Sequence, residues 1–475
     1  MNLGVRADDG TPSVRGMADP TYDLVVLGTG SGGEVVAGEV ARAGGTVVAV
    51  DSGLVGGECP YVACVPSKAL LMAAREHELV GGDHAAAFAK AIVRRDEAAV
   101  QRHDDGAVQG LLSDGVEVLR GRGLLAGQSG TGLVVEVNQR RLHARAVVIG
   151  TGSEPAIPPI QGLDDVPTWT SDQALSSPER PARLAILGGG AVGCELAQVY
   201  ASFGTHVVLL EAGDTLLGRE PAWVGERLAA ALRDLGVDVR TGVTITGVKP
   251  HKSGLSLQVD EGTGVIAERL LVAGGRRPRS ADLGLGTVGV GPADDATITV
   301  DLRCRVIGLD GAPVEGLFAV GDVTGVAPYT HTATYQGRIV AAHLLGHGRD
   351  ADYSGVPRAV YTDPAVFGVG EQADAARARG VHALVDGIDL EETGRGFIAG
   401  ARGGRLELVV DASTGRLLGA SAIGPDADSW GGELALAVRA GLDVRLLADH
   451  VRAFPTWSEA IAPVAARLAT QVAAR

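Results

Sequence analysis

The stretch YDLVVLGTGSGGEVVAGEVARAGGTVVAVD, residues 22–51, combines an apolar strand, a glycine-rich turn, a helix rich in Ala and Val, and a second strand that ends in Asp51. The turn contains Gly28, Gly30 and Gly33, and glycines at such positions let the backbone approach a pyrophosphate. The N-terminus of the following helix faces the charge of that group. A carboxylate at the end of the second strand can accept hydrogen bonds from a ribose diol. Because all four parts occur in order, this stretch predicts a dinucleotide-binding unit.

A second copy of the pattern occurs in RLAILGGGAVGCELAQVYASFGTHVVLLE, residues 183–211. The glycines of its turn and the acid of its second strand are Gly188, Gly190, Gly193 and Glu211. In both copies the acid follows the first glycine by 23 positions. Two such units in one chain favour two different dinucleotides, most simply a flavin and a nicotinamide, over one ligand with one decayed unit.

Further glycine-rich turns follow three other buried strands, in RAVVIGTGSEP (145–155), ERLLVAGGRRP (268–278) and GLFAVGDVTG (316–325). The candidate cofactor-binding residues in these turns are Thr151, Gly152, Gly275 and Asp322. Asp322 is a candidate partner for a ligand hydroxyl. The segment THTATYQGRIVAAHLLG, residues 330–346, predicts a helix capped by Thr330 or Thr332. The dipole at its N-terminus would stabilise negative charge on a reduced flavin.

The stretch GGECPYVACVPSKALL, residues 56–71, contains two cysteines five positions apart, Cys59 and Cys64. A structural zinc site requires four ligands, and the other two cysteines, Cys194 and Cys304, are isolated in a predicted helix and strand, as small core residues are. Positions i and i+5 lie about 140° apart on a regular helix. The pair can therefore bridge only if the segment is distorted or if Cys59 sits at the helix entrance, where amide dipoles lower the pKa of a thiol. A reactive dithiol is favoured over zinc ligands and over inert buried thiols.

The overall composition excludes several function classes. The chain of 475 residues has a formal net charge of -15 and no cluster of basic residues, so nucleic acid and anionic membranes are poor partners. No apolar run reaches the roughly 18 residues that a membrane span requires. Residues 1–20 are polar and lack the apolar core of a signal peptide, so we expect a loose tail and a cytoplasmic protein. No metal site is expected.

From about Tyr22 onward the chain resembles the FAD-dependent pyridine nucleotide–disulfide oxidoreductases, the family of dihydrolipoamide dehydrogenase, glutathione reductase and mercuric reductase. The most specific match is to the active-site helix pattern G-G-x-C-x4-C-x-P-x-K of that family. The chain departs from this pattern at Glu58, where Thr is usual, and at Pro60-Tyr61, where Leu-Asn or Val-Asn is usual. The resemblance implies an α/β fold with two Rossmann-like dinucleotide-binding domains and a C-terminal α+β dimerisation domain.

The resemblance also implies a domain order. After the tail of residues 1–20, an FAD-binding domain comprises residues 21–155 and 285–352, interrupted by an NAD(P)-binding domain at residues 156–284. Residues 353–475 form the interface domain of a homodimer, and the stretch VYTDPAVFGVGEQ resembles its opening strand. The active site takes residues from both subunits.

The family's order of events assigns roles to the residues of the thiol segment. Cys64 lies against the flavin as the charge-transfer thiolate, Cys59 is the exposed interchange thiol, and Gly57 belongs to the FAD site. Lys68 falls on the same helix face as Cys64 and pairs with Glu195 beside flavin N5. Electrons would then pass from NAD(P)H to FAD, to the Cys59–Cys64 disulfide, and on to a small substrate.

Glu211 bears on the choice of nicotinamide dinucleotide. A carboxylate about 4 Å from the 2′-phosphate of NADPH would cost about 4 kcal/mol per unit charge pair at an effective dielectric constant of 20. This cost favours NADH. Arg219, eight residues further on, could offset it.

The segment VRAFPTWSEAIAP, residues 451–463, lacks a histidine that the family uses. The family pattern is H-P-T-x-x-E, a His–Glu dyad that the partner subunit supplies, and here Phe454 takes the place of the histidine while Glu459 is retained. Loss of a general acid or base costs about 10²–10⁴ in rate, roughly 3–5.5 kcal/mol. Either His450 or Glu459, the latter with a pKa raised by burial, replaces the histidine, or the substrate does not need it.

Several acceptors therefore remain open. The 2-ketopropyl coenzyme M oxidoreductase/carboxylase branch also has Phe here, which excludes protons from a carbanion, but it changes the glutamate. Mercuric reductases lack the dyad but add a C-terminal cysteine pair, whereas this chain ends in ATQVAAR. The leading prediction is a dimeric enzyme that uses FAD and NADH to reduce a disulfide-type or related substrate. The alternatives are reductive C–S cleavage, reduction of a quinone or a metal ion, and, least favoured, a non-enzymatic flavoprotein sensor.

Overall fold

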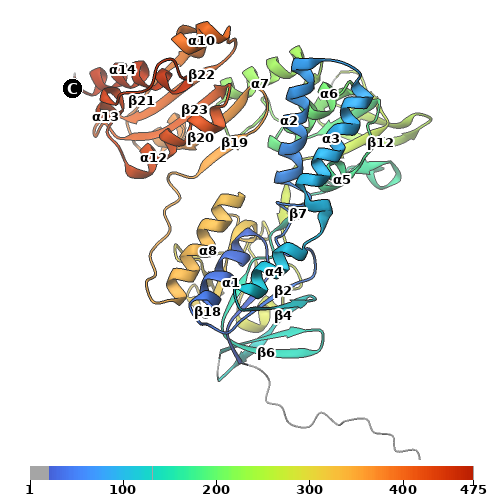
Figure 1. Ribbon diagram of the computed structural model, residues 1–475, viewed down its shortest axis with the longest axis vertical. Coiled ribbons are helices and arrows are strands. Elements are labelled where there is room, and N and C mark those ends of the chain that lie inside the picture. The colour runs from blue at the N-terminus through green and yellow to red at the C-terminus, as the bar shows by residue number, and fades with distance from the viewer. Residues whose placement is uncertain (1–20, 131, 261, 474–475) are drawn as a thin grey trace, which may run out of the picture.

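The first glycine-rich unit lies at the centre of a mixed sheet, in the lower half of Figure 1. The computed structural model describes residues 21–130, 132–260 and 262–473, and the predicted tail, residues 1–20, lies outside these ranges. In spatial order the strands are β17 (Arg305–Ile307), β18 (Pro313–Ala319), β6 (Arg140–Ile149), β1 (Thr21–Leu27), β2 (Val47–Asp51) and β3 (Val116–Arg120). In addition, β5 (Gly132–Val137) pairs with β6, and β4 (Gly123–Ser129) pairs with β5. From β18 to β3 neighbouring strands run parallel, as strand–helix–strand crossovers require.

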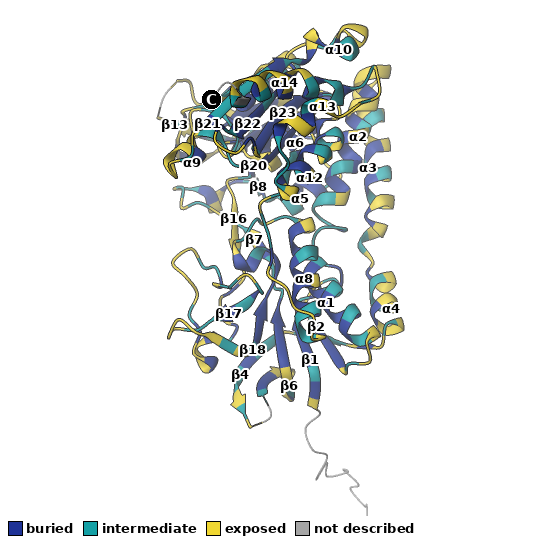
Figure 2. Ribbon diagram, turned by 90° about the vertical axis from the view of Figure 1, so that its left-hand side faces the viewer, coloured by how far each residue is buried: buried dark blue, intermediate teal, exposed yellow. Residues whose placement is uncertain are grey.

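Apolar side chains cover both faces of this first sheet. Leu24 and Val26 of β1 pack in one cluster with α1 (Ser31–Arg42) and α8 (Thr330–Leu344), two helices that lie side by side in Figure 1. Val25 and Leu27 face the opposite cluster because successive side chains of a strand alternate between the faces. The strands of this sheet are accordingly among the buried segments in Figure 2. The carboxyl ends of the parallel strands, where the glycine turns lie, are left for a ligand.

The second glycine-rich unit forms its own parallel sheet. Its strands, in spatial order, are β11 (Asp238–Arg240), β10 (His206–Leu210), β9 (Arg183–Leu187), β15 (Arg269–Val272) and β8 (Thr168–Trp169). One face packs on α6 (Ala191–Ser202) and α7 (Ala222–Asp234), and the other packs on the antiparallel strands β12 (Ile245–His251), β13 (Gly254–Val259) and β14 (Val265–Ala267). Both predicted units thus have the expected order of strand, turn, helix and strand.

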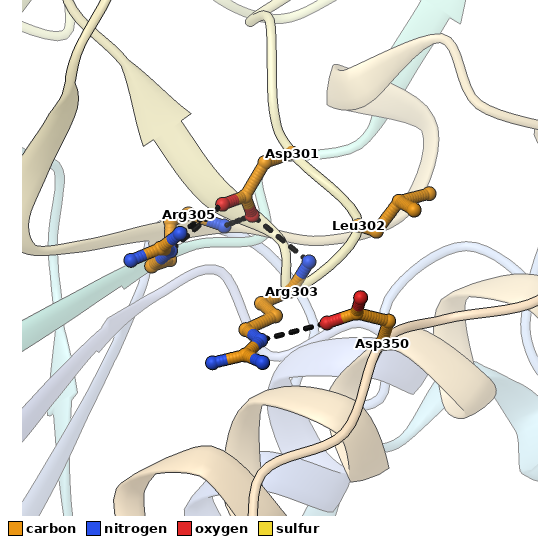
Figure 3. A pocket seen from close by; sticks show the side chains of 5 residues that line it. All are labelled: Asp301, Leu302, Arg303, Arg305 and Asp350. Atoms are coloured by element: carbon orange, nitrogen blue, oxygen red, sulfur yellow. Dashed lines mark hydrogen bonds and ion pairs between the residues drawn. The ribbon is translucent and has the colours of Figure 1, made fainter.

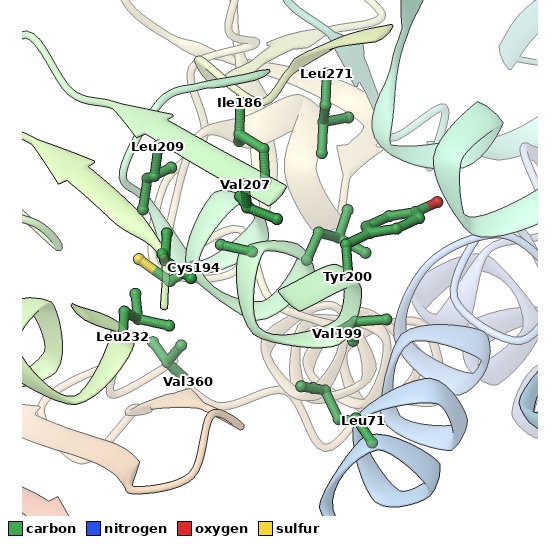
Figure 4. Close-up of a cluster of buried hydrophobic side chains, with 14 of the residues drawn as sticks. Leu71, Ile186, Cys194, Val199, Tyr200, Val207, Leu209, Leu232, Leu271 and Val360 are labelled. Carbon is green, nitrogen blue, oxygen red and sulfur yellow. The ribbon is translucent and has the colours of Figure 1, made fainter. Parts of the chain in front are cut away.

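The helix that begins at Cys64, α2 (Cys64–Val80), packs on α6 and on α3 (His84–Ala98), and all three helices share the apolar cluster on one face of the second sheet. Figure 4 shows Leu71 of α2 in the same apolar cluster as Val199 and Tyr200 of α6. The thiol segment therefore starts next to the first sheet, and its helix packs on α6, which covers the second sheet.

Cys194 and Cys304 are both fully buried, as predicted for core residues. Cys194 lies in α6, but Cys304 does not lie in a strand. It occupies the turn before β17 with a φ of 60°, where its amide donates to Asp301 O at 2.9 Å.

Two short strands connect the sheets. β7 (Ser153–Pro155) follows the first sheet along the chain, and β16 (Arg276–Pro278) follows the second. They pair antiparallel with each other and form a two-stranded ribbon, which we call the crossing ribbon.

The C-terminal part contains an antiparallel sheet. Its strands, in spatial order, are β19 (Pro357–Val360), β20 (Ala365–Gly370), β23 (Leu417–Gly424), β22 (Arg405–Asp411) and β21 (Ala383–Asp389). The helices α12 (Gly432–Ala440), α13 (Val444–Asp449) and α14 (Ile461–Ala473) share its apolar cluster. A largely buried ion pair between Arg358 and Glu220 joins this part to the second sheet. The domain limits given above remain a prediction.

Candidate functional site

The first glycine turn is shaped by close backbone contacts. Gly28 has a φ of +97°, and a Cβ atom there would lie 2.4 Å from Gly150 O. A Cβ atom on Gly33 would lie 2.0 Å from Gly28 O, so only glycine allows the helix to start this close to the strand. Gly30, in contrast, faces open space within 4 Å. This arrangement fits the approach of a dinucleotide to the N-terminus of α1.

Asp51 lies beside this turn, at the end of β2. Its Oδ2 accepts hydrogen bonds from Thr29 N at 2.7 Å and from Thr29 Oγ1 at 2.6 Å, and its Oδ1 accepts one from Gly53 N at 2.8 Å. These bonds fix the carboxylate next to the first glycine turn. Its role as a ribose ligand stays a prediction.

The thiol segment packs against the same turn. A Cβ atom on Gly57 would lie 2.8 Å from Gly30 Cα, and Gly56 N donates to Thr29 O at 3.0 Å. The structure thus brings Gly57 and the first fingerprint together, as expected for one shared site.

Cys64 is the first residue of α2, and Cys59 lies in the turn before the helix. Val65 N donates to Cys59 O at 3.0 Å, which folds the turn back on the helix. Both thiols are free and partly buried. The hydrogen bond from the Cys59 thiol, with smaller contributions from Thr330 and the Lys68 charge, lowers the pKa of Cys64 to about 6.

The pKa of Cys59 is raised, because its thiol proton is held by Cys64 and because it is buried. Cys59 does not sit at the helix entrance, which was one of the two arrangements that its spacing from Cys64 allowed. The residue at the helix N-terminus is Cys64, which has the lowered pKa. This assignment of charge agrees with the order that the resemblance implies.

Lys68 and Glu195 are 127 residues apart in the chain and in direct contact in the structure. Lys68 Nζ donates to Glu195 Oε2 at 2.8 Å, and the Glu195 side chain is only 6% exposed. Glu195 Oε1 accepts from Tyr361 N at 3.0 Å. The Lys68 ammonium also lies 4.5 Å from the centre of the Tyr361 ring. Tyr361 is a site residue that the sequence reasoning missed, because its contacts come from the packing of the C-terminal part.

The N-terminus of α8 also reaches the thiols. Thr330 Oγ1 lies 3.5 Å from Cys64 Sγ. Neither Thr330 nor Thr332 caps the helix, since the cap residue is Tyr329 and no side chain makes a capping bond. The prediction of a threonine cap is wrong because both hydroxyls lie inside the first turn. Thr332 Oγ1 is buried and has no hydrogen-bond partner among the described residues, so its hydroxyl is free to donate to a ligand.

The second glycine turn repeats the geometry of the first. A Cβ atom on Gly188 would lie 2.5 Å from Ala273 O, and one on Gly193 would lie 1.9 Å from Gly188 O, whereas Gly190 faces open space. Glu211 accepts hydrogen bonds from Gly189 N and Gly213 N, both at 2.6 Å. These residues fit a second dinucleotide.

Arg219 does not pair with Glu211 in the described chain. It lines a cavity of about 640 Å³ at the boundary with the C-terminal part.

The remaining predicted cofactor residues surround the crossing ribbon. Gly152 and Gly275 have positive φ angles and face open space. Thr151 Oγ1 donates to Arg279 O at 2.7 Å. Asp322 Oδ2 accepts from Ser153 Oγ at 2.6 Å, so one carboxylate oxygen is already engaged.

Phe454 and Glu459 lie in the C-terminal part, and neither contacts the thiols within the described chain. The side chain of Phe454 is largely exposed, at 77%. Glu459 Oε1 accepts from Arg395 N at 2.7 Å, while its Oε2 is buried and has no partner within the described ranges. His450 is exposed at the end of α13.

A pocket of about 400 Å³ lies away from all these residues (Figure 3). Its charged groups neutralise one another, since Arg303 pairs with Asp350 and Arg305 with Asp301, both at 2.7 Å. In the part of the chain that the structure describes, no three His, Cys, Asp or Glu side chains are placed to hold a metal ion. Among the described helices, none is long and apolar enough to span a membrane.

Comparison with known proteins covers almost the whole chain. Residues 22–337 match the family described as pyridine nucleotide-disulphide oxidoreductase, and residues 356–465 match the dimerisation domain of that family. The chain is 35% identical to a dihydrolipoyl dehydrogenase of Thermus scotoductus over 95% of its length and 98% of the relative's length. It is 31% identical to a mercuric reductase of Shewanella putrefaciens, over 94% and 80% of the two lengths.

Among solved structures, the HOCl-induced flavoprotein disulfide reductase RclA from Escherichia coli superposes with a TM-score of 0.83. The two chains are 28% identical, and the match covers 94% of this chain and 99% of RclA. These matches extend over both glycine-rich units, the thiol segment and the antiparallel C-terminal sheet. The chain therefore belongs to the family of FAD-dependent pyridine nucleotide-disulphide oxidoreductases.

Proposed function

We propose that this protein is a homodimeric oxidoreductase that transfers two electrons from NADH to its Cys59–Cys64 disulfide and on to a small disulfide or related sulfur substrate. For a disulfide the balance is NADH plus H⁺ plus RSSR to NAD⁺ plus two RSH. The observation that carries the proposal is the thiolate site at Cys64. A hydrogen-bond donor, Cys59, and a cation, Lys68, both favour its charged form.

The chain's own residues supply the two cofactor sites. The first turn, with Gly28, Gly30 and Gly33, the carboxylate of Asp51 and the backbone at Gly57 would hold FAD, and Thr332 Oγ1 offers an unused donor. The second turn and Glu211 would hold the nicotinamide dinucleotide. When bound, FAD would accept a hydride equivalent from the nicotinamide and reduce the disulfide. Glu211 would repel a 2′-phosphate, so NADH is preferred over NADPH.

Lys68 supplies positive charge near Cys64, while the Glu195 carboxylate, which acts on the thiol with the opposite sign, holds the ammonium in place. Glu195 is buried and bonded to Tyr361 N, so it fixes the position of the Lys68 ammonium. The ammonium in turn favours the Cys64 thiolate, so that Cys64 does not need a separate base to lose its proton. Cys59 keeps its proton while Cys64 is charged, and it is the thiol that would attack the substrate once it is deprotonated.

The substrate class depends on Phe454. The resemblance places this segment of the partner subunit at the dithiol, and the exposed ring of Phe454 is suited to burial in a dimer interface. An apolar ring cannot relay a proton to a departing thiolate. This favours a second candidate function, reduction of a metal ion or a quinone, for which no thiolate needs protonation. RclA from Escherichia coli has itself been solved as a Cu(II) complex.

An anaerobic titration with NADH, and separately with NADPH, tests the proposal. A long-wavelength charge-transfer band after two electrons, lost in the Cys64→Ser variant, is the expected result. Bleaching of the flavin without this band would overturn the dithiol step. Turnover of a quinone by a variant lacking both cysteines would favour direct reduction by the flavin. A preference for NADPH would contradict the role of Glu211.

A further inference from the structure

Glu58 immediately precedes Cys59 and carries two ion pairs. Its Oε2 binds Arg276 Nη2, and its Oε1 binds Arg279 Nη2 at 2.6 Å. All three side chains are partly exposed, at 30%, 32% and 44% for Glu58, Arg276 and Arg279. We call these three residues the Glu58 clamp. Both arginines belong to the segment that returns from the second sheet to the first. Arg276 follows Glu58 by 218 positions in the chain, and Arg279 follows it by 221.

Arg276 extends the clamp across the crossing ribbon. Its Nε donates to Ser153 Oγ at 2.7 Å, and its Nη2 donates to Ser153 O at 2.8 Å. Ser153 Oγ then donates to Asp322 Oδ2 at 2.6 Å. One connected set of hydrogen bonds thus runs from the residue before Cys59, through both strands of the ribbon, to the carboxylate after β18.

The thiol segment has other anchors, but they lie on a different side. Tyr61 OH donates to Val55 O at 3.0 Å, and Val55 N donates to Asp104 Oδ2 at 2.6 Å. Arg120 at the end of β3 contacts Asp104. These contacts tie the segment to the first sheet. Among the described residues 52–63, Glu58 is the side chain that joins the segment to β7 or β16.

We infer that Glu58 is a positioning residue that couples the Cys59 turn to the crossing ribbon. The ribbon connects the two nucleotide-binding sheets. The contact of Glu58 with the ribbon therefore fixes the position of the Cys59 turn relative to both sheets. The inference rests on the proposed function for its chemical consequence, because the position of Cys59 affects catalysis only if the dithiol takes up electrons. Its structural part, the restraint of residues 52–63, stands independently.

The charge arrangement explains why a carboxylate is needed here. Two guanidinium groups less than half exposed would repel each other without an anion between them, and a hydroxyl or an amide cannot neutralise them. Replacement of Glu58 therefore removes both ion pairs of the clamp at once, although Arg276 keeps its hydrogen bonds to Ser153. Replacement of either arginine leaves the other ion pair with Glu58 intact. Glu154 provides a matched control, because its Oε2 lies 3.8 Å from Arg279 Nε but its main chain belongs to the ribbon and not to the thiol segment.

Two measurements on the holoenzyme test the clamp in Glu58→Gln, Glu58→Thr, Arg279→Gln and Glu154→Gln variants. The first is amide hydrogen exchange of residues 52–63. We expect the Glu58 variants to exchange about threefold to tenfold faster than wild type, the range that the loss of two partly exposed ion pairs produces, with a smaller increase in Arg279→Gln and none in Glu154→Gln. The second is the amplitude of the charge-transfer band after two-electron reduction, which should fall in the same order while the KM for NADH is unchanged.

The two readouts separate the possible failures. Absence of the band in wild type would overturn the proposed function, and the exchange data would still decide on the clamp. A normal band and unchanged exchange in both Glu58 variants would overturn the clamp. An equal effect in Glu154→Gln would also overturn it, because a general loss of negative charge would then explain the result. If a Glu58 variant does not fold, the double variant Arg276→Gln/Arg279→Gln decides, since it removes both partners of Glu58 and a wild-type exchange rate there contradicts the coupling.

Discussion

Replacing Lys68 with methionine removes the ammonium group that pairs with Glu195 and acts on Cys64, and two consequences follow. The first concerns stability. Removal of one partner of a fully buried ion pair costs about 3–5 kcal/mol because the other charge stays buried. The Lys68 side chain is 32% exposed, so water screens this pair, and the hydrogen bond from Tyr361 N to Glu195 remains. We therefore expect the free energy of unfolding to fall by about 1–3 kcal/mol, measured by urea denaturation of the holoenzyme.

The second consequence concerns the thiolate. The pKa of Cys64 is about 6, mainly because Cys59 donates a hydrogen bond to it, and the Lys68 charge adds to this effect. Loss of the charge should raise the pKa of Cys64 by about one unit, equivalent to about 1.4 kcal/mol. The assay is a pH titration of the charge-transfer band, whose amplitude disappears as the thiolate is protonated. The midpoint should therefore move to higher pH in Lys68→Met.

Glu195→Gln is the matched control, because the Glu195 carboxylate acts on Cys64 with the opposite sign. Its midpoint should stay in place or move to lower pH. The double variant should recover part of the lost stability, since no uncompensated charge then stays buried. A midpoint that moves to lower pH in Lys68→Met, or the same direction of change in both single variants, would refute the electrostatic reasoning.

Three further predictions test other parts of the molecule. Phe454→His should raise the kcat for a small disulfide such as lipoamide by about 10²–10⁴, and a loss of wild-type activity in His450→Ala would instead identify that histidine as the replacement. Gly33→Ala places a Cβ atom 2.0 Å from Gly28 O, so we expect about 1–3 kcal/mol of lost stability and a lower flavin content by visible absorbance, which full flavin occupancy would contradict. Burial, with a smaller effect of the Asp51 charge, raises the pKa of Glu34 from 4.5 to about 7, so its ionisation above pH 7 destabilises the folded state and the penalty disappears as the pH falls toward 4.5. Glu34→Gln should stabilise the protein by about 1–2 kcal/mol at pH 8, after allowance for its partial exposure, and an equal gain at pH 4.5 in thermal unfolding would contradict this cause.

The glycine turns illustrate how much of this protein is predictable from local sequence. A strand, a turn with positive φ and a helix N-terminus are determined by residues within a few positions of one another, and Gly28 to Asp51 contains all of them. The same local logic failed at α8. Thr330 and Thr332 are both suitable caps by residue type, but the chain places Thr330 Oγ1 at Cys64 instead.

The thiol site shows the limit of that approach. The spacing of the two cysteines predicted a reactive pair, and the lowered pKa of Cys64 agrees with it. Which of the two carries the charge depends on where the helix starts and on which donors surround it. Those facts follow from packing, and the isolated segment was compatible with a lowered pKa at Cys59 instead.

By itself the sequence determined the two nucleotide-binding units, the α/β class, the family and the missing histidine, because each depends on residue types at short, fixed spacings. The tertiary structure alone decided which distant groups meet. Tyr361 bonds to Glu195 from 166 positions away, and Glu58 pairs with Arg276 across 218 positions. Such contacts depend on how the sheets and the C-terminal part pack together. No local pattern encodes them, since an exposed carboxylate or tyrosine has the same local signature whether or not a distant partner reaches it.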